Sequence, residues 1–351
     1  MIATEPILNF TLPRTLEATE PPEARGKGRD DVRLLVSRRS SLTIEHHRFT
    51  DLPELLRPGD LLIFNRSATV NAALEANALS QPAILHVARR LSDSEWIVEL
   101  RHAEPNGLST TPWLDAPART KIALRGGGQA MLLRPAVKAE AVRLWIAEVE
   151  LDESAEEYLA RWGRPIVYGY IMKSRPLSDY QTIFADLPGS AEMPSAARPF
   201  TAELVTRLLV RGVDFAPILL HCGVSSLEAH EPPQPEPFEV PPDTARRVNA
   251  ALRVGGRVIA VGTTSVRALE SAAVGPGLAI PASGVTDLVV GHNYTPRVTT
   301  GLLTGWHEPL ASHLAVVEAF AGRPLLEASY GAALEAGYLW HEFGDSHLIL
   351  P

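Results

Sequence analysis

The residues most suited to chemistry form a short run of glycine and hydroxyl side chains between an expected strand and an expected helix. Residues 257–261 predict a buried strand, and Gly262, Thr263, Thr264 and Ser265 follow where a helix begins. The first amides of a helix have no acceptor within the helix, so this run could bind a carboxylate, a phosphate or ribose hydroxyls. The same residues could equally be an ordinary helix cap.

Three more side chains could transfer a proton or accept a hydrogen bond from a ligand. His307 and His221 each follow an apolar segment, and each could be a general acid or base or a hydrogen-bonded core histidine. Asp345 could accept from a ligand or close a turn. His307, His221 and Asp345 are therefore the candidate catalytic residues.

No combination of residues indicates a metal or redox site. The single Cys222 excludes an internal disulfide and a cysteine-based zinc or iron–sulfur site. The histidine pair at 46–47 and the histidines His341 and His347 lack metal-ligand spacing with a third partner, so we expect them at the surface. The glycines at 126–128 lack the lysine of a phosphate-binding loop and predict a hairpin turn.

The composition indicates a folded protein of a reducing compartment. Of 351 residues, 45% are hydrophobic and 21% are charged, which is ordinary for a globular chain. The first residues do not resemble a signal peptide, and no apolar run approaches the ~18 residues that span a bilayer. We therefore expect a cytoplasmic protein. The net charge of −8 attracts no polyanion, so nucleic acid would need a local basic patch.

Hydrophobic periodicity divides the chain into two kinds of structure. The apolar segment at 61–65 predicts a strand buried on both faces. From 68 to 150, short alternating segments predict an antiparallel barrel or sandwich. After residue 152, helical segments alternate with apolar strands. We predict an α/β fold in which a mixed-sheet domain, residues 1–67 and 151–351, is interrupted by a smaller antiparallel β-barrel domain, residues 68–150. A proline-rich loop at 232–237 is a candidate lid or spacer.

A longer match of residues points to a family. The run RVIAVGTTSVRALES at 257–271 resembles, with almost no change, the signature segment of the S-adenosylmethionine:tRNA ribosyltransferase-isomerase family of queuosine biosynthesis. Further segments resemble family motifs in the same order: RPGDLLIFN at 57–65, YQTIFA at 180–185, TDL at 286–288, LLT at 302–304 and FGD at 343–345. The chain is thus identified as a divergent member of that family.

The resemblance implies a reaction and its participants. The ribosyl part of S-adenosylmethionine, the co-substrate, would be transferred to 7-aminomethyl-7-deazaguanine in tRNA and rearranged to epoxyqueuosine, with loss of adenine and methionine and with no metal. The sulfonium acidifies the adjacent ribose carbon, so a base could form an ylide there. The implied substrate-binding residues are Gly262, Thr263, Thr264, Ser265, Arg267, Asn65, Gln181 and Thr304.

Several polar positions of the family differ here. After Asn65 the family reads Asp-Thr-Arg-Val-Ile-Pro-Ala-Arg, where this chain has RSATVNAA at 66–73. A family histidine is absent from 196–200, and a family lysine is replaced by Leu310. Two alternatives therefore stay open: a paralogue with a small-molecule acceptor, and a non-catalytic relative that binds a nucleoside or tRNA. The first alternative predicts a closed neutral pocket, and the second a pocket without ionisable groups. We expect a monomer or weak homo-oligomer.

Overall fold

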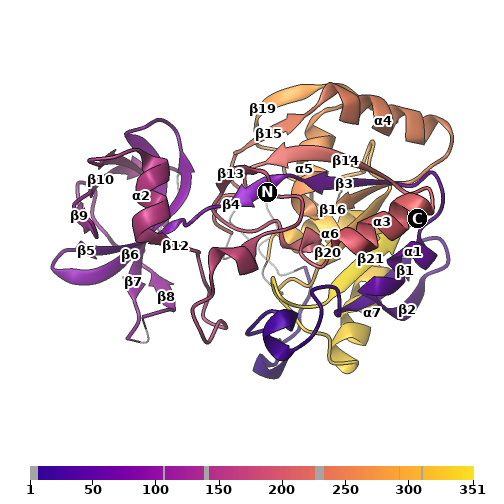
Figure 1. Ribbon diagram of the computed structural model, residues 1–351, viewed down its shortest axis with the longest axis horizontal. Helices are drawn as coiled ribbons and strands as arrows, with labels where there is room; N and C mark the ends of the chain where they lie inside the picture. The colour runs from indigo at the N-terminus through magenta and orange to yellow at the C-terminus, as the bar shows by residue number, and fades with distance from the viewer. Residues whose placement is uncertain (1–6, 106, 138–141, 226–232, 292, 310) are drawn as a thin grey trace.

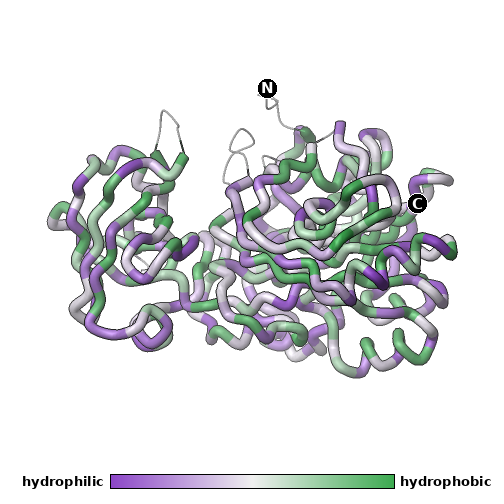
Figure 2. Tube along the Cα trace, turned by 90° about the horizontal axis from the view of Figure 1, so that it is seen from above, coloured by the Kyte–Doolittle hydropathy of each residue, from purple (hydrophilic) through white to green (hydrophobic). Residues whose placement is uncertain are grey.

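The computed structural model describes residues 7–105, 107–137, 142–225, 233–291, 293–309 and 311–351. Two lobes lie side by side along the long axis of the molecule (Figures 1 and 2). The larger lobe contains the main sheet and most helices, and the smaller contains the barrel strands (Figure 1). Leu310, where the chain departs from the family, and Pro232, the first residue of the proline-rich segment, lie outside the described residues.

The larger lobe is built on a mixed sheet, which confirms the predicted fold class. Among the described residues its strand order is β19-β15-β14-β3-β16-β20-β21-β1-β2. Strands β14, β3, β16 and β20 run parallel to one another, whereas β15 and β21 run antiparallel to their neighbours β14 and β20. The strands span Arg33–Arg38 (β1), Thr43–Arg48 (β2), Leu61–Asn65 (β3), Asp214–Leu220 (β14), Glu236–Val240 (β15), Val258–Val261 (β16), Ala282–Thr286 (β19), Gly301–Gly305 (β20) and Ser346–Leu350 (β21).

Helices cover both faces of this sheet, which explains its apolar central strands. Leu61 and Ile63 of β3 pack on the side of α4 and α5, while Leu62 between them packs on the side of α1 and α3. Helices α6 and α7 extend the first layer over β20 and β21. The helices span Leu52–Leu55 (α1), Ala202–Val210 (α3), Pro242–Arg253 (α4), Thr263–Ser271 (α5), His313–Ala321 (α6) and Arg323–Glu335 (α7). Burial on both faces was predicted from the unbroken apolar pattern of 61–65.

The smaller lobe contains a closed antiparallel barrel, as predicted. The strands pair in the order β5-β6-β7-β11-β10-β9, and β9 returns to β5, so no edge of this ring is left open. The glycines at 126–128 form the predicted turn between β9 and β10. The strands span Ala73–Ala78 (β5), Gln81–Arg90 (β6), Glu95–Ala103 (β7), Thr110–Pro112 (β8), Lys121–Leu124 (β9), Gln129–Pro135 (β10) and Leu144–Glu150 (β11).

Segments on both sides of the barrel join it to the larger lobe. Helix α2 (Ala155–Trp162) packs into the barrel's core, and the short strand β12 (Gly163–Arg164) pairs with β5. Strand β4 (Ser67–Thr69) instead pairs with β13 (Leu187–Ser190), outside the barrel. The segments that pack on the barrel therefore extend beyond residue 150, where the predicted insert ends.

Two expectations about local structure were wrong. Glu236 and Pro237, predicted to lie in a loop, begin strand β15, because β14 and β19 supply partners on both sides. His347, expected at the surface, is fully buried in β21, where it bonds to Ser37 Oγ at 2.8 Å and stacks on Trp306. A short hairpin, β17 (Ala273–Gly275) with β18 (Leu278–Ala279), completes the strands. No described helix is long and apolar enough to cross a membrane.

Candidate active site

The polar loops lie at one edge of the main sheet. The four parallel strands end there, and the antiparallel strands β15 and β21 begin there. In open α/β sheets, ligands bind at the carboxyl ends of the parallel strands. A cavity of about 1170 Å³ opens at this edge and reaches the loop that follows the barrel. It is lined by residues that include Thr69, Tyr168, Tyr170, Glu192, Cys222, Ser225, Glu236, Gly262, Thr263, Thr264, Arg267, Thr304, His307, His313, His341 and Glu342.

The start of helix α5 opens into this cavity. Gly262 has φ 90° and ψ 153°, a conformation that glycine adopts readily, and no side chain caps the helix. Thr263 and Thr264 line the cavity, whereas Ser265 is fully buried and donates from Oγ to the Val261 carbonyl at 2.8 Å. The amides and hydroxyls of Thr263 and Thr264 are therefore placed to meet a ligand, and the side chain of Ser265 is not.

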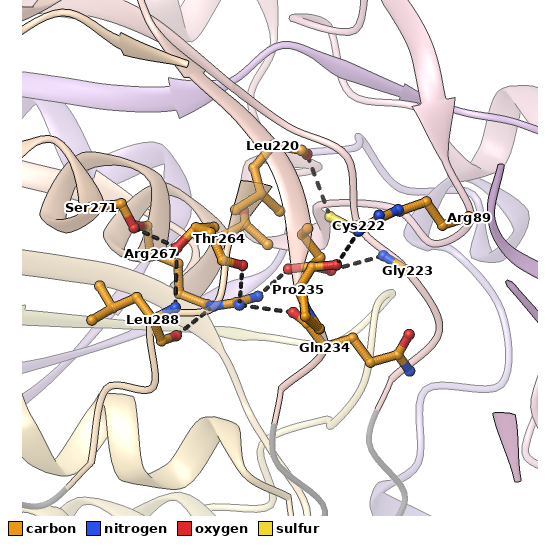
Figure 3. Close-up of polar contacts among 12 residues, drawn as sticks. Arg89, Leu220, Cys222, Gly223, Gln234, Pro235, Thr264, Arg267, Ser271 and Leu288 are labelled. Atoms are coloured by element: carbon orange, nitrogen blue, oxygen red, sulfur yellow. Dashed lines mark hydrogen bonds and ion pairs between the residues drawn. The ribbon is translucent and has the colours of Figure 1, made fainter. Parts of the chain in front are cut away.

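Arg267 lies on the cavity wall, but its guanidinium is engaged with protein groups (Figure 3). It forms an ion pair with Glu236 and donates to the carbonyls of Leu288 at 3.0 Å and Gln234 at 2.9 Å. Glu236 in turn accepts from the Gly223 amide at 2.8 Å. Arg267 thus joins both ends of the connection between β14 and β15 to the loop that follows β19. We therefore interpret it as a positioning residue.

Asn65 and Gln181 do not line the cavity; they order the backbone behind it. The Asn65 amide donates to the Leu220 carbonyl at 2.8 Å and accepts from the Leu220 amide at 3.1 Å, which joins β3 to β14. Gln181 pairs with both backbone groups of Thr69, at 3.0 and 2.8 Å. Thr69 does line the cavity. Both amide side chains therefore support the site without facing it.

His307 lies in the cavity beside Thr304. Its Nε2 is 3.0 Å from Thr304 Oγ1, and its ring stacks on His313 with centroids 4.9 Å apart. Burial, with the neighbouring His313, His341 and His347, holds the pKa of His307 well below its usual value. The imidazole is therefore neutral at pH 7 and is a weak base there.

The structure does not bring His221 and Asp345 into the cavity lining. His221 Nδ1 is 2.7 Å from Ser67 Oγ, in the region between β4 and β13. Asp345 accepts from the Leu339 amide at 2.8 Å and the Arg33 amide at 2.7 Å, and it forms an ion pair with Arg33 at 3.0 Å. Asp345 therefore closes the turn before β21, one of the two interpretations that the sequence allowed.

Two carboxyl groups that the sequence did not single out face the cavity. Glu192 accepts from the Tyr168 hydroxyl, from the Ser225 amide at 2.8 Å and from Ser225 Oγ at 2.5 Å. Glu342 accepts from the Tyr170 hydroxyl at 2.6 Å. Among the described residues, no lysine or arginine forms an ion pair with either group.

Burial raises the pKa of both carboxyl groups. The pKa of Glu192 lies above its usual value, and that of Glu342 is raised to about 7, with a smaller contribution from Glu192. Two half-buried carboxyl groups without a protein cation form a site that a positively charged ligand would complete.

Two other cavity residues help to define its chemistry. Burial raises the pKa of the Cys222 thiol far above its usual value, so this group is a poor nucleophile. His341, expected at the surface, instead lines the cavity and stacks on Tyr170 with centroids 3.7 Å apart. No group of three metal-ligating side chains was found in the part of the chain that the structure describes.

Fold and site together define a two-lobed α/β protein with a large polar ligand cavity at the carboxyl edge of its main sheet. The chain matches the family described as "Queuosine biosynthesis protein" over residues 7–349, so it belongs to that family.

Known relatives match over nearly the whole chain. Proteins named S-adenosylmethionine:tRNA ribosyltransferase-isomerase from Desulforamulus reducens and Thermus thermophilus are 33% and 36% identical to it. These matches cover 97% and 92% of this chain and 98% and 93% of the relatives. A crystal structure of S-adenosylmethionine tRNA ribosyltransferase from Thermotoga maritima is similar with a TM-score of 0.54 and 27% identity, and it covers 98% of this chain and 100% of its own.

Proposed function

We propose that this chain transfers the ribosyl part of S-adenosylmethionine to 7-aminomethyl-7-deazaguanine in tRNA and rearranges it to epoxyqueuosine, releasing adenine and methionine. The relatives that match along its length carry the name of this activity. One observation about the site carries the proposal: an uncapped helix N-terminus and two carboxyl groups without a protein cation line the same cavity.

These features suit S-adenosylmethionine, which has a sulfonium, an ammonium, a carboxylate and ribose hydroxyls. Glu192 and Glu342 would attract the positive groups, and the start of α5 at Thr263 and Thr264 would accept a carboxylate or ribose hydroxyls. His313 and His341, whose pKa values burial lowers to about 4, are neutral at pH 7 and do not repel a cation.

The two alternatives make different demands on the cavity. A non-catalytic relative was expected to lack ionisable groups there, whereas this cavity contains Glu192, Glu342 and His307. A paralogue that uses S-adenosylmethionine with a different small-molecule acceptor is favoured by one observation, that Arg267 is already paired with Glu236. An acceptor assay decides between tRNA and a small molecule.

Purified protein should be incubated with S-adenosylmethionine and tRNA that carries either 7-aminomethyl-7-deazaguanine or unmodified guanine. Adenine and methionine are then measured by mass spectrometry. Release that requires the modified tRNA would support the proposal. Release with the free modified base alone would favour the small-acceptor paralogue, and binding without release would favour the non-catalytic alternative. We further propose that the reaction takes place in the cytoplasm, with tRNA as the macromolecular partner.

A further inference from the structure

We propose that the carboxylate of Glu342 is the base that removes a proton from the ribose carbon bonded to the sulfonium, with Glu192 as a second carboxyl group beside it. This assignment rests on the proposed function and adds the identity of its base. In the step, a C–H bond breaks and an O–H bond forms on Glu342. The electron pair stays on the carbon, where the adjacent sulfonium stabilises it as an ylide.

The position of Glu342 supports this role. Glu342 lines the cavity, and its carboxyl group accepts from Tyr170 at 2.6 Å and has no ion-pair partner among the described lysines and arginines. An ion-paired carboxylate such as Glu236 is committed to its arginine, whereas Glu342 can approach a cationic substrate. The sulfonium supplies that cation.

The turn that carries Glu342 is held rigidly. His341 has φ 72°, an uncommon conformation for a residue with a side chain, and its ring stacks on Tyr170. A Cβ on Gly344 would lie 2.3 Å from the Leu339 carbonyl, so only glycine fits there. Asp345 fixes the other end of the turn through the Leu339 amide at 2.8 Å. The predicted site residue Asp345 thus positions Glu342, and such preorganisation is what a reacting group requires.

The ionisable surroundings favour Glu342 over the histidines. The ionisable groups that act on it are Tyr170, Glu192, Tyr180 and Arg198, and His341 precedes it in the chain. Burial raises the pKa of Glu342 to about 7, near the pH at which a general base is most effective. His307 shares the cavity, but its pKa is well below the usual value, so it holds protons weakly.

The test measures proton exchange as well as product release. Wild type, Glu342→Gln and the control Glu335→Gln, an exposed residue at the end of α7, are incubated with S-adenosylmethionine and modified tRNA in D₂O. Deuterium in the ribose carbon next to sulfur and adenine release are followed. We expect both rates to fall at least about 100-fold in Glu342→Gln and to be unchanged in Glu335→Gln. S-adenosylmethionine should bind Glu342→Gln about tenfold more weakly, because a carboxyl group that attracts its positive groups is lost, so both rates are compared at saturating S-adenosylmethionine.

A pH profile and a stability measurement separate catalysis from structure. The base must be ionised, so the wild-type kcat/KM for S-adenosylmethionine, which reports the free protein, should rise with pH through about 7. The pKa of Glu342 is higher in the folded state than its ordinary value of 4.5. Its protonation therefore contributes stability that is fully present below pH 4.5 and is lost as pH rises through about 7. Glutamine does not ionise, so Glu342→Gln should melt at the same or a higher temperature than wild type at pH 8.

Each other outcome has a defined meaning. If Glu342→Gln exchanges the ribose proton and releases adenine within threefold of the wild-type rates, the assignment is overturned. A Glu342→Gln variant that melts at a lower temperature at pH 8 and no longer binds S-adenosylmethionine would also overturn it. Wild type that exchanges the ribose proton but does not modify tRNA would overturn the proposed acceptor alone. Wild type that neither exchanges nor releases adenine would overturn both proposals.

Discussion

At the scale of single residues, the cavity combines neutral histidines with carboxyl groups of raised pKa. His313 and His341 have pKa values lowered to about 4, and Glu342 has one raised to about 7. Burial is the main cause in all three cases, because it disfavours whichever form is charged. The site therefore carries little positive charge of its own, which suits a substrate whose reactive centre is a sulfonium.

Thr264→Val should weaken S-adenosylmethionine binding about tenfold. The change removes a hydroxyl at the start of α5 but keeps the branched shape, so one ligand hydrogen bond worth roughly 1.4 kcal/mol is lost. Calorimetry measures the dissociation constant. Thr206→Val, on the exposed side of α3, is the control, because that hydroxyl bonds only within its own helix. Equal dissociation constants for the two variants would show that the start of α5 does not contact S-adenosylmethionine.

His307→Gln should lower kcat less than about tenfold. The glutamine amide can still bond to Thr304, and the histidine is already neutral at the working pH. Steady-state release of adenine at pH 7.5 measures the effect. A loss of more than about 100-fold, together with a normal Glu342→Gln variant, would make His307 the base instead.

At the scale of the elements, the signature segment of 257–271 mainly holds the sheet edge together. Arg267 joins the connection between β14 and β15 to the loop after β19. Glu270, which is fully buried, accepts from the amides of Arg297, Val298 and Thr299 at 2.8 to 3.1 Å. The first residues of the segment, Gly262 to Thr264, open into the cavity, and Arg267 lies on the cavity wall with its guanidinium paired to Glu236. A long match of sequence thus marks both a ligand site and its scaffold.

Arg267→Met should destabilise the protein by about 3–5 kcal/mol, because it leaves the Glu236 carboxyl group buried without its cation. Urea unfolding of the purified variant measures the loss. Arg246→Ala, which breaks an exposed ion pair with Asp243 on α4, should leave the free energy of unfolding nearly unchanged. Adding Glu236→Gln to Arg267→Met should recover part of the loss. Similar stabilities for Arg267→Met and Arg246→Ala would refute the positioning role.

These contacts show what the sequence could and could not predict. The mixed sheet, the barrel and the helix start at Gly262 could be predicted, because they depend on hydrophobic periodicity and glycine positions within short stretches of sequence. Glu192 and Glu342 lie 150 residues apart in sequence and acquire their role only when the loop after the barrel meets the turn before β21. Asn65 and Arg267 lie in matched motifs, but their hydrogen-bond partners come from other strands and loops. The sequence alone therefore could not show whether these residues contact a ligand or support the backbone around the site.

At the scale of the whole molecule, the lobes have separate cores. The barrel core consists mainly of residues 72–166, and among the described residues of the larger lobe only Ala191 and Val224 belong to it as buried residues. Both residues lie in segments that line the cavity. The cavity is therefore formed by the larger lobe together with the loops that reach the barrel, and the far strands of the barrel, β9 and β10, take no part in it.

Binding of S-adenosylmethionine should slow amide hydrogen exchange in three segments, residues 222–225, 262–265 and 305–309, and leave β9 and β10 unchanged. Ligand contacts stabilise the closed form of the amides that they touch or bury. Mass spectrometry of peptides with and without the ligand measures the difference. Protection confined to the barrel would place the ligand elsewhere.

The most direct test of ribosyl transfer in this protein follows the atoms of the co-substrate. Two samples of S-adenosylmethionine, one labelled with ¹³C in the ribose and one in the methyl group, are incubated with the protein and modified tRNA, and the tRNA is digested to nucleosides for mass spectrometry. We predict that the ribose label appears in the modified nucleoside and the methyl label leaves with methionine. Methyl label in the tRNA, or no label from either sample, would contradict the proposed function.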